Sequence, residues 1–305
     1  MAQTQKHIPV MLDEVLQALN PQDGKTYVDA TFGNGGYTSA ILNAADCKVI
    51  ALDRDPTVVK RADELKKIYG DRFEFVAGRF GDFAKLVTQD IDGAVFEIGV
   101  SSMQIDTADR GFSFAKDGAL DMRMSLDGKS AKDIVNTYGE KELADILYNY
   151  GEEKKSYQIA RKIVQYREEK EISSTTELAE IIYSVIHKKF GEIDPATRTF
   201  QALRIAVNNE LEELQNGLEG AVLRLKSGAP IIVVSFHSLE ERIVKNYFKE
   251  KSGKTAGTSR YMPEVQKTAQ QIYFTKYSKA IAPSAEEIAR NPRSRSAKMR
   301  FALKS

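Results

Sequence analysis

The stretch that most constrains the fold runs from Tyr27 to Gly36 and reads YVDATFGNGG. Tyr27 and Val28 are typical of the end of a buried strand, a loop with three glycines follows, and a helix-like segment begins at Ser39. Strand, glycine-rich turn and helix form the first half of a mononucleotide-binding α/β unit. Such glycines let a ligand lie against bare backbone, although an ordinary turn shows the same pattern.

A second feature, an acid at the end of the next strand, favours the ligand-binding interpretation. Residues 48–52 are apolar and β-branched, and Asp53 follows them directly. It lies about one βα unit after the loop, where an acid at a strand tip can take both ribose hydroxyls. The alternative is a solvated strand-end acid. Loop and acid together favour a nucleoside-bearing cofactor.

The alternation of strand-like and helix-like segments predicts an α/β fold. Further strand-like segments end at Ala77 and Val100, with helix-like segments between them, and this alternation is typical of a parallel sheet. Strand-like segments resume later and cover residues 230–234, 272–277 and 298–303. A sheet that resumes after an interruption indicates one discontinuous domain rather than two in tandem.

The segment between the two groups of strand-like segments differs from them in composition. Residues 111–123 form a loop rich in glycine and aspartate, and residues 131–189 are charged and helical with no strand candidate. An amphipathic stripe then predicts one long helix over residues 199–225. We therefore expect a Rossmann-like domain made of residues 1–110 and 199–305, with an all-helical domain, residues 111–198, inserted into it.

Composition excludes several classes of protein. The 305 residues carry a formal net charge of +1, so overall charge does not indicate a nucleic-acid binder. The single cysteine, Cys47, allows no disulfide within the chain, and no apolar run approaches the length of a membrane span. A soluble, cytoplasmic protein that does not bind a membrane is expected.

Other polar and aromatic residues follow the strand tips. In an open parallel sheet, ligands bind at the carboxyl ends of the strands. Phe80 could wall in a base there, or belong to the core. Glu97 stands in an apolar strand, where a buried carboxylate needs a partner, either a ligand ammonium group or a backbone amide. Gln104 offers a donor and an acceptor just beyond this strand.

Long motifs resemble one known family, the MraW methyltransferases, which act on amine-4 of a cytosine in bacterial 16S ribosomal RNA. The similarity covers nearly the whole chain. It rests on HIPVMLDEVL at residues 7–16, YVDATFGNGG at 27–36, ALDRDP at 51–56, GVSSMQID at 99–106, RGFSF at 110–114, GALDMRM at 118–124, TFQALRIAVNNEL at 199–211, SFHSLE at 235–240 and NPRSRSAKMR at 291–300.

The resemblance implies an enzyme that uses S-adenosyl-L-methionine to methylate the exocyclic amine of a cytidine in the decoding region, within the assembled small ribosomal subunit. It also implies a Rossmann-like methyltransferase domain with an inserted helical domain. The family's cofactor contacts fall on Gly35, Gly36, Tyr37, Asp53, Phe80, Glu97 and Gln104. Tyr37 stands where the family commonly has histidine, and Glu97 stands where it commonly has aspartate. No metal is expected, and the sequence leaves open whether the chain is a monomer or a homodimer.

Amine methylation needs little from the protein beyond alignment and a hydrogen-bond acceptor. The lone pair of cytosine's exocyclic nitrogen is delocalised into the ring, and an acceptor for its hydrogens localises that pair. The candidates are His237, Asp121, Asp106 and the Ser101–Ser102 tip. The alternatives are that His237 is held in a structural turn and that Asp121 only fixes its loop. Methylation at ring carbon 5 would need a thiolate, and Cys47 lies before the second strand, away from the strand tips.

RNA binding is expected to show as local charge. The last sixteen residues hold six cations and no acid, and we expect RNA contacts from Arg293, Arg295, Lys298 and Arg300. A second basic region surrounds a glycine-rich stretch at residues 253–258 and contains Lys245, Lys249, Lys251, Lys254 and Arg260.

Other functions remain open on the residues alone. A small-molecule amine methyltransferase on the same scaffold predicts an enclosed pocket and no need for the basic tail. A nucleotide-binding regulatory or assembly protein predicts cofactor binding without methyl transfer. A dinucleotide dehydrogenase fits least, because the loop reads G-x-G-G and no second nucleotide-binding half is visible.

Overall fold

The computed structural model describes residues 9–188, 191–253 and 271–305. The chain forms two compact units. One combines Met1–Gly99 with Leu211–Ser305 and is called the sheet unit below. The other is Val100–Glu210 and is called the helical unit.

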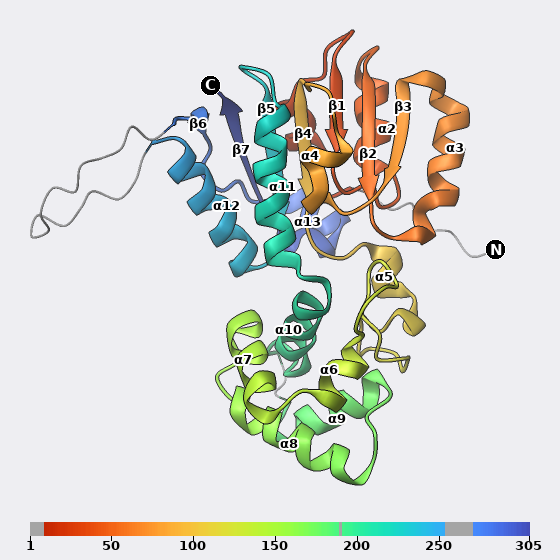
Figure 1. Ribbon diagram of the computed structural model, residues 1–305, viewed down its shortest axis with the longest axis vertical. Coiled ribbons are helices and arrows are strands. Elements are labelled where there is room, and N and C mark those ends of the chain that lie inside the picture. Colours follow the sequence, from red (N-terminus) through yellow and green to blue (C-terminus); the bar gives the residue numbers. More distant parts are fainter. Residues whose placement is uncertain (1–8, 189–190, 254–270) are drawn as a thin grey trace, which may run out of the picture. The chain divides into compact units, whose positions relative to one another are not determined.

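The sheet unit contains, within its described residues, a seven-stranded sheet of order β3-β2-β1-β4-β5-β7-β6 (Figure 1). The first five strands in that order are parallel, and β7 runs antiparallel between β5 and β6. This order steps outward in both directions from β1, so the predicted Rossmann-like fold is confirmed. The strands are β1 (Thr26–Asp29), β2 (Lys48–Asp53), β3 (Phe73–Ala77), β4 (Gly93–Glu97), β5 (Pro230–Ser235), β6 (Phe274–Tyr277) and β7 (Lys298–Lys304).

Helices cover both faces of this sheet. Side chains of α4 (Phe83–Leu86), α11 (Glu210–Arg224) and α12 (Ser238–Lys251) share one core with the strands. On the other face, α1 (Leu12–Leu19) contacts β4 and β5, and α2 (Gly36–Ala44) contacts β2 (Figure 1). The remaining helices of this unit are α3 (Val59–Tyr69) and α13 (Ala285–Arg290).

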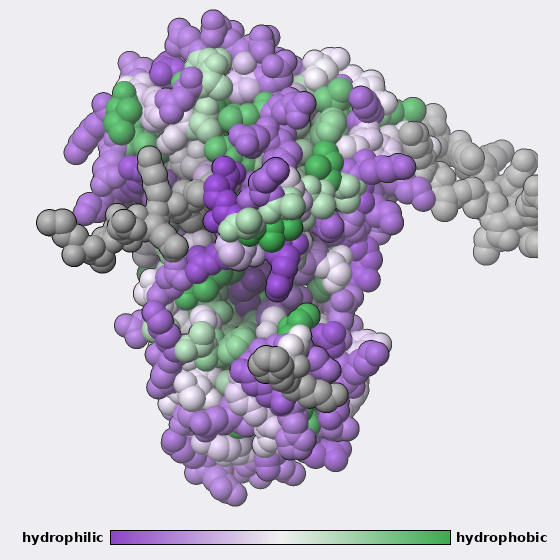
Figure 2. Space-filling model, turned by 180° about the vertical axis from the view of Figure 1, so that it is seen from behind, coloured by the Kyte–Doolittle hydropathy of each residue, from purple (hydrophilic) through white to green (hydrophobic). Residues whose placement is uncertain are grey.

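The helical unit has its own core. It contains α5 (Ser102–Asp106), α6 (Ala131–Thr137), α7 (Glu140–Gly151), α8 (Ser156–Glu169), α9 (Thr175–Val185) and α10 (Ala196–Asn208). Its described residues include no strand, only an isolated bridge between Ala119 and Ser174. Leucines, isoleucines and alanines of α6 to α10 fill the interior. The face in Figure 2 is mainly hydrophilic with scattered apolar areas, as expected when apolar side chains gather in cores.

The single helix predicted over residues 199–225 is wrong, because the chain breaks at Asn209. This residue has φ 51°, in the left-handed region that asparagine tolerates better than most residues, and it separates α10 from α11. Phe200 and Leu203, before the break, belong to the helical core, whereas Leu214 and Leu218, after it, belong to the sheet core. The apolar stripe that looked continuous is therefore two stripes that fill different cores.

The unit boundaries also differ from the predicted domain boundaries of 110/111 and 198/199. The first lies after Gly99, because Arg110 donates from Nη2 to the carbonyl oxygens of Arg123 (2.9 Å) and Met124 (3.0 Å) and so fixes the preceding loop to the helical unit. The second lies after Glu210, because α10 packs on α7. The change in sequence composition therefore lies eleven and twelve residues away from the change in packing.

No helix among the described residues combines the length and apolar character that a membrane crossing requires.

Candidate nucleoside-cofactor site

The glycine loop joins β1 to α2 in a conformation that few other residues allow. Gly33 and Gly35 have φ values of 51° and 73°. A Cβ on Gly35 would lie 2.5 Å from Leu65 Cδ1 and 2.9 Å from the Phe32 ring, so this position is restricted by packing as well as by φ. Glycine at these two positions therefore allows the tight turn that leads from β1 into α2.

Asp29, at the tip of β1, organises this loop. Its carboxylate is fully buried and accepts hydrogen bonds from Thr38 Oγ1 (2.7 Å), the Thr38 amide (3.1 Å) and the Thr31 amide (3.2 Å). Burial raises its pKa to about 6, although these hydrogen bonds oppose the shift. Asp29 was not among the site residues predicted from the sequence. Its role could have been recognised from its position, because it is an acid that ends a strand directly before a glycine loop.

Asp53 lies at the tip of β2 and is tied to the same loop. It accepts hydrogen bonds from the Gly33 amide (2.7 Å) and the Asp55 amide (2.8 Å). Burial raises the pKa of Asp53 to about 6, and the neighbouring charges of Asp55 and Asp29 add to this effect. The position agrees with the predicted ribose-binding acid at the carboxyl edge of the sheet.

Glu97 ends β4 and has the most perturbed carboxyl group of this edge. Burial, followed by the negative charges of Asp29 and Glu287, raises its pKa to about 8, while a hydrogen bond from the Val10 amide opposes the shift. Its own backbone N–H donates to Thr31 Oγ1 at 2.7 Å. Since these carboxylates lie in a poorly solvated place, a ligand that brings positive charge would relieve their electrostatic cost.

Tyr37, in the first turn of α2, is buried with 3% of its surface exposed. Its hydroxyl donates a short hydrogen bond to the Val10 carbonyl oxygen. Burial, with the charges of nearby acids, raises its pKa well above the usual value. Tyr37 therefore holds the backbone of Val10.

Phe80 follows β3 and is fixed by α11. Its ring meets the Phe96 ring edge-on, with centroids 5.9 Å apart. Glu213 of α11 accepts a hydrogen bond from the Gly81 amide (3.1 Å) and lies 3.6 Å from the Arg79 guanidinium. Glu213 was not among the predicted site residues, because the apolar stripe of this helix indicated only that it packs against a core.

Gly217 lets α11 approach Phe80, and its replacement is a testable prediction. A Cβ at Gly217 would lie 2.8 Å from Phe80 Cδ2 and 3.0 Å from the Phe80 carbonyl oxygen. We expect Gly217→Ala to lower the free energy of unfolding by about 1–3 kcal/mol, as overpacking does. Thermal or urea unfolding measures this. Asn216→Ala, on the exposed side of the same helix, is the control; equal stability of the two variants would contradict the packing argument.

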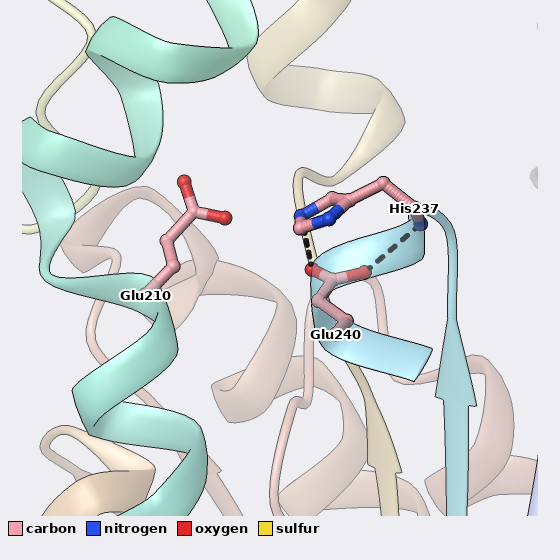
Figure 3. Close-up of side chains that lie close together, drawn as sticks. All are labelled: Glu210, His237 and Glu240. Atoms are coloured by element: carbon pink, nitrogen blue, oxygen red, sulfur yellow. Dashed lines mark hydrogen bonds and ion pairs between the residues drawn. The ribbon is translucent and has the colours of Figure 1, made fainter. Parts of the chain in front are cut away.

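His237 lies between β5 and α12, at the carboxyl edge where the sequence placed it. Its side chain is 10% exposed, and Nε2 lies 3.0 Å from Oε1 of the fully buried Glu240, three residues on in α12 (Figure 3). The other carboxylate oxygen of Glu240 accepts hydrogen bonds from the amides of Phe236 (2.8 Å) and His237 (3.2 Å). Both ring nitrogens of His237 are buried, and neither has a partner with hydrogen-bond geometry among the described residues, so Nε2 is within ion-pair distance of Glu240 without a hydrogen bond to it.

The position of the Glu240 carboxylate favours one of the two tautomers of the His237 imidazole. A carboxylate beside Nε2 favours the tautomer that carries the proton there, which leaves the lone pair on Nδ1. His237 is thus built as a hydrogen-bond acceptor held by Glu240, a residue that the sequence analysis did not single out. Glu210, also drawn in Figure 3, belongs to the helical unit, where it accepts hydrogen bonds from Arg204 at 2.8 and 2.9 Å.

The other predicted site residues lie in the helical unit, in structural roles. Ser101 caps α5 in a reciprocal capping box: its Oγ accepts from the Gln104 amide (3.2 Å), and Gln104 Oε1 accepts from the Ser101 amide (3.0 Å). Asp121 is bonded to the Arg123 guanidinium, with a closest distance of 2.7 Å. The hydrogen bonds from Arg123 hold the pKa of Asp121 below its usual value despite partial burial.

The predicted RNA-binding residues separate into two groups. Arg293, Arg295 and Lys298 are exposed. Arg300 is 8% exposed and donates through Nε to Glu241 at 3.0 Å and through Nη1 to the Ser278 carbonyl oxygen at 3.2 Å. The structure thus commits Arg300 to a partner within the sheet unit. Of the second basic region, Lys254 and Arg260 lie outside the described residues.

Comparison with known proteins assigns the family. The model of the MraW methylase family matches residues 4–305. "Ribosomal RNA small subunit methyltransferase H" of Rickettsia massiliae is 54% identical over 98% of both chains. The proteins of the same name from Rickettsia akari and Rickettsia bellii are 53% and 52% identical, over 98% of this chain and 99% of each relative. A family model that covers almost the whole sequence, together with relatives of this identity, shows that the chain belongs to the MraW methylase family.

Proposed function

We propose that this protein transfers a methyl group from S-adenosyl-L-methionine to the exocyclic amine of a cytidine in the decoding region of 16S ribosomal RNA, within the small ribosomal subunit. The observation that carries the proposal is the set of acids at the tips of β1, β2 and β4 around the glycine loop, in a member of a methylase family. The relatives are named as small-subunit rRNA methyltransferases, which supports the substrate class.

The residues present fit this cofactor. Asp53 would take the ribose hydroxyls, and Glu97 would pair with the ligand's ammonium group. Gly35 and Gly36 would let the ligand lie against the N-terminus of α2, which favours a carboxylate. Phe80 would wall the adenine. The bound cofactor supplies a methyl group on a sulfonium centre.

His237 is our proposed acceptor for the amine hydrogens. Its Nδ1 is unpartnered among the described residues, whereas Asp121 is bonded to Arg123 and Ser101 to Gln104. An acceptor on the amine hydrogen localises the nitrogen lone pair and can take the proton as the methyl group transfers. Glu240 would then stabilise the resulting imidazolium, because its carboxylate faces the other ring nitrogen.

Cys47 supports an amine target rather than a ring carbon. Methylation at carbon 5 of a pyrimidine uses a thiolate that adds to the ring. Cys47 is 1% exposed, lies before β2 at the amino end of that strand, and has its pKa raised by burial. It therefore cannot serve as that nucleophile at the carboxyl edge.

RNA would be bound by Arg293, Arg295 and Lys298, which are exposed around the start of β7. Arginine forks and lysine charges on one surface suit phosphate groups. Arg300 is left out of this set because its guanidinium is bonded to Glu241. The target base must be unpaired or flipped out to reach the cofactor.

The pH dependence of cofactor binding is a prediction that follows from Glu97. In the free protein its pKa is about 8, so most molecules hold a proton there at pH 6.5, and pairing with an ammonium group releases it. The bound form holds fewer protons, so affinity must rise with pH. We expect the dissociation constant of S-adenosylhomocysteine to fall by up to about tenfold from pH 6.5 to 7.5, a range in which a ligand amine stays largely protonated.

Isothermal titration calorimetry measures this slope. Asp29 and Asp53, whose pKa values are about 6, are mostly ionised in this range and contribute little. Glu97→Gln should bind weakly at both pH values and show no slope. A slope that persists in Glu97→Gln would assign the titration to another group.

Methyl transfer from labelled S-adenosylmethionine tests the function against its alternatives. We expect label in the RNA of small ribosomal subunits that lack this methylation, and none in a panel of small amines. A triple variant of Arg293, Arg295 and Lys298 to alanine should lose transfer to subunits but keep cofactor binding. Label in small amines would favour the small-molecule methyltransferase, and cofactor binding without any transfer would favour a regulatory or assembly protein.

A further inference from the structure

Residues 9–11, called the N-terminal strap here, lie against two parts of the candidate site, α2 and the tip of β4, and against a third segment, α13. The Pro9 ring covers Gly36, where an added Cβ would lie 2.2 Å from Pro9 Cγ. The Val10 carbonyl oxygen accepts a hydrogen bond from the Tyr37 hydroxyl, and the Val10 amide lies near the Glu97 carboxylate, whose pKa it lowers. These contacts join the strap to α2 and to the tip of β4.

The third contact comes from the far end of the chain. The Met11 amide donates to Oε1 of Glu287, in α13, at 2.7 Å. Glu287 is 5% exposed, and its other oxygen lies 3.6 Å from Nη2 of Arg290. Met11 is fully buried with φ 53°, a strained conformation for methionine. Such a residue stays in place only when its surroundings hold it, and the Glu287 carboxylate is the side chain that receives its amide.

We propose that the N-terminal strap forms the wall of the cofactor site around the aminoacyl end of S-adenosylmethionine, and that Glu287 is a positioning residue that holds this wall. The inference rests on the proposed function, since it takes Glu97 as the partner of the ligand's ammonium group. Glu287 does not touch the ligand. It acts through Met11 on Val10, whose carbonyl oxygen accepts the Tyr37 hydroxyl and whose amide lies near the Glu97 carboxylate.

The geometry explains why the effect is confined to one end of the ligand. The strap contacts Gly36, Tyr37 and Glu97, which surround the N-terminus of α2 and the tip of β4. Asp53 and Phe80, the residues proposed for ribose and adenine, lie at the ends of β2 and β3, and among the described residues neither shares a hydrogen bond with the strap. Loosening the strap should therefore weaken contacts with the amino acid part and spare the nucleoside part.

Two ligands separate these parts in a calorimetric experiment. S-adenosylhomocysteine carries the aminoacyl end, and 5′-methylthioadenosine lacks it. We expect Glu287→Ala to weaken S-adenosylhomocysteine binding about tenfold, the effect of losing a hydrogen bond to a charged group, and to change 5′-methylthioadenosine binding less than twofold. Glu287→Gln keeps an acceptor oxygen for the Met11 amide and should restore binding to within about threefold of the wild type.

Matched variants control the comparison. Glu286→Ala removes an exposed carboxylate from the same helix and should change neither affinity. Tyr37→Phe removes the hydroxyl that holds Val10 and should act in the same selective way as Glu287→Ala.

The outcomes separate this inference from the proposed function. Equal weakening of both ligands by Glu287→Ala, or no weakening of either, overturns the inference, because the residue would then act on general stability or not at all. A wild-type protein that binds neither ligand contradicts the proposed function itself.

Discussion

Replacing His237 by alanine is expected to lower the rate of methyl transfer to small ribosomal subunits by about two orders of magnitude, within the range that a positioned acid–base group contributes. The reason is the loss of the acceptor nitrogen Nδ1, which is buried and unpartnered among the described residues. Cofactor affinity should stay within about twofold of the wild type, because the proposed cofactor contacts lie on other strand tips. Single-turnover transfer and calorimetry with S-adenosylhomocysteine measure the two quantities.

Two further variants make this prediction specific. His187→Ala removes an exposed histidine of the helical unit and should leave the rate unchanged. Glu240→Gln removes the charge beside Nε2 that favours one imidazole tautomer, so it should lower the rate while binding of S-adenosylhomocysteine is kept. A His237→Ala enzyme with the full rate would show that the amine needs no acceptor from this residue.

Replacing Asp53 by alanine is expected to weaken S-adenosylhomocysteine binding by about 100-fold, the effect of losing about two hydrogen bonds to a charged acceptor. The carboxylate would bind the ribose, and it also accepts the amides of Gly33 and Asp55, so its loss removes both a ligand contact and an anchor of the glycine loop. Asp53→Asn keeps the shape and should lose less. Calorimetry at pH 7.5, where Asp53 is ionised, measures the effect.

The controls distinguish ligand contact from folding. Asp71→Ala removes a fully exposed carboxylate from the turn before β3 and should change neither affinity nor melting temperature. If Asp53→Ala bound S-adenosylhomocysteine as tightly as the wild type, the glycine loop and its acid would not be the nucleoside site.

Short sequence patterns predicted those elements of the fold that depend on a few neighbouring residues. The glycine loop, the strand that ends in Asp53 and the acid at Glu97 could be recognised because strand, turn and helix signals are encoded within a few residues. The break at Asn209 could not, because the apolar spacing continues through it and only tertiary packing assigns the two halves to different cores.

The candidate site shows the same limit. Sequence reasoning proposed His237 from its place after a strand, but Glu240 becomes relevant only when the first turn of α12 brings its carboxylate to Nε2. Arg300 looked like its basic neighbours, yet its partner Glu241 lies 59 positions away in the chain. Contacts of this kind, like that between Met11 and Glu287, depend on the folded chain and leave no local pattern.

The most direct test of the account is nucleoside analysis by mass spectrometry after incubation of the protein with small ribosomal subunits and S-adenosylmethionine that carries a heavy methyl group. If the proposed function is correct, we expect the heavy methyl group on the exocyclic amine of one cytidine, as N4-methylcytidine. We expect none in the His237→Ala reaction at the same time point. Heavy label at ring carbon 5, or bound cofactor with no label in any nucleoside, would contradict it.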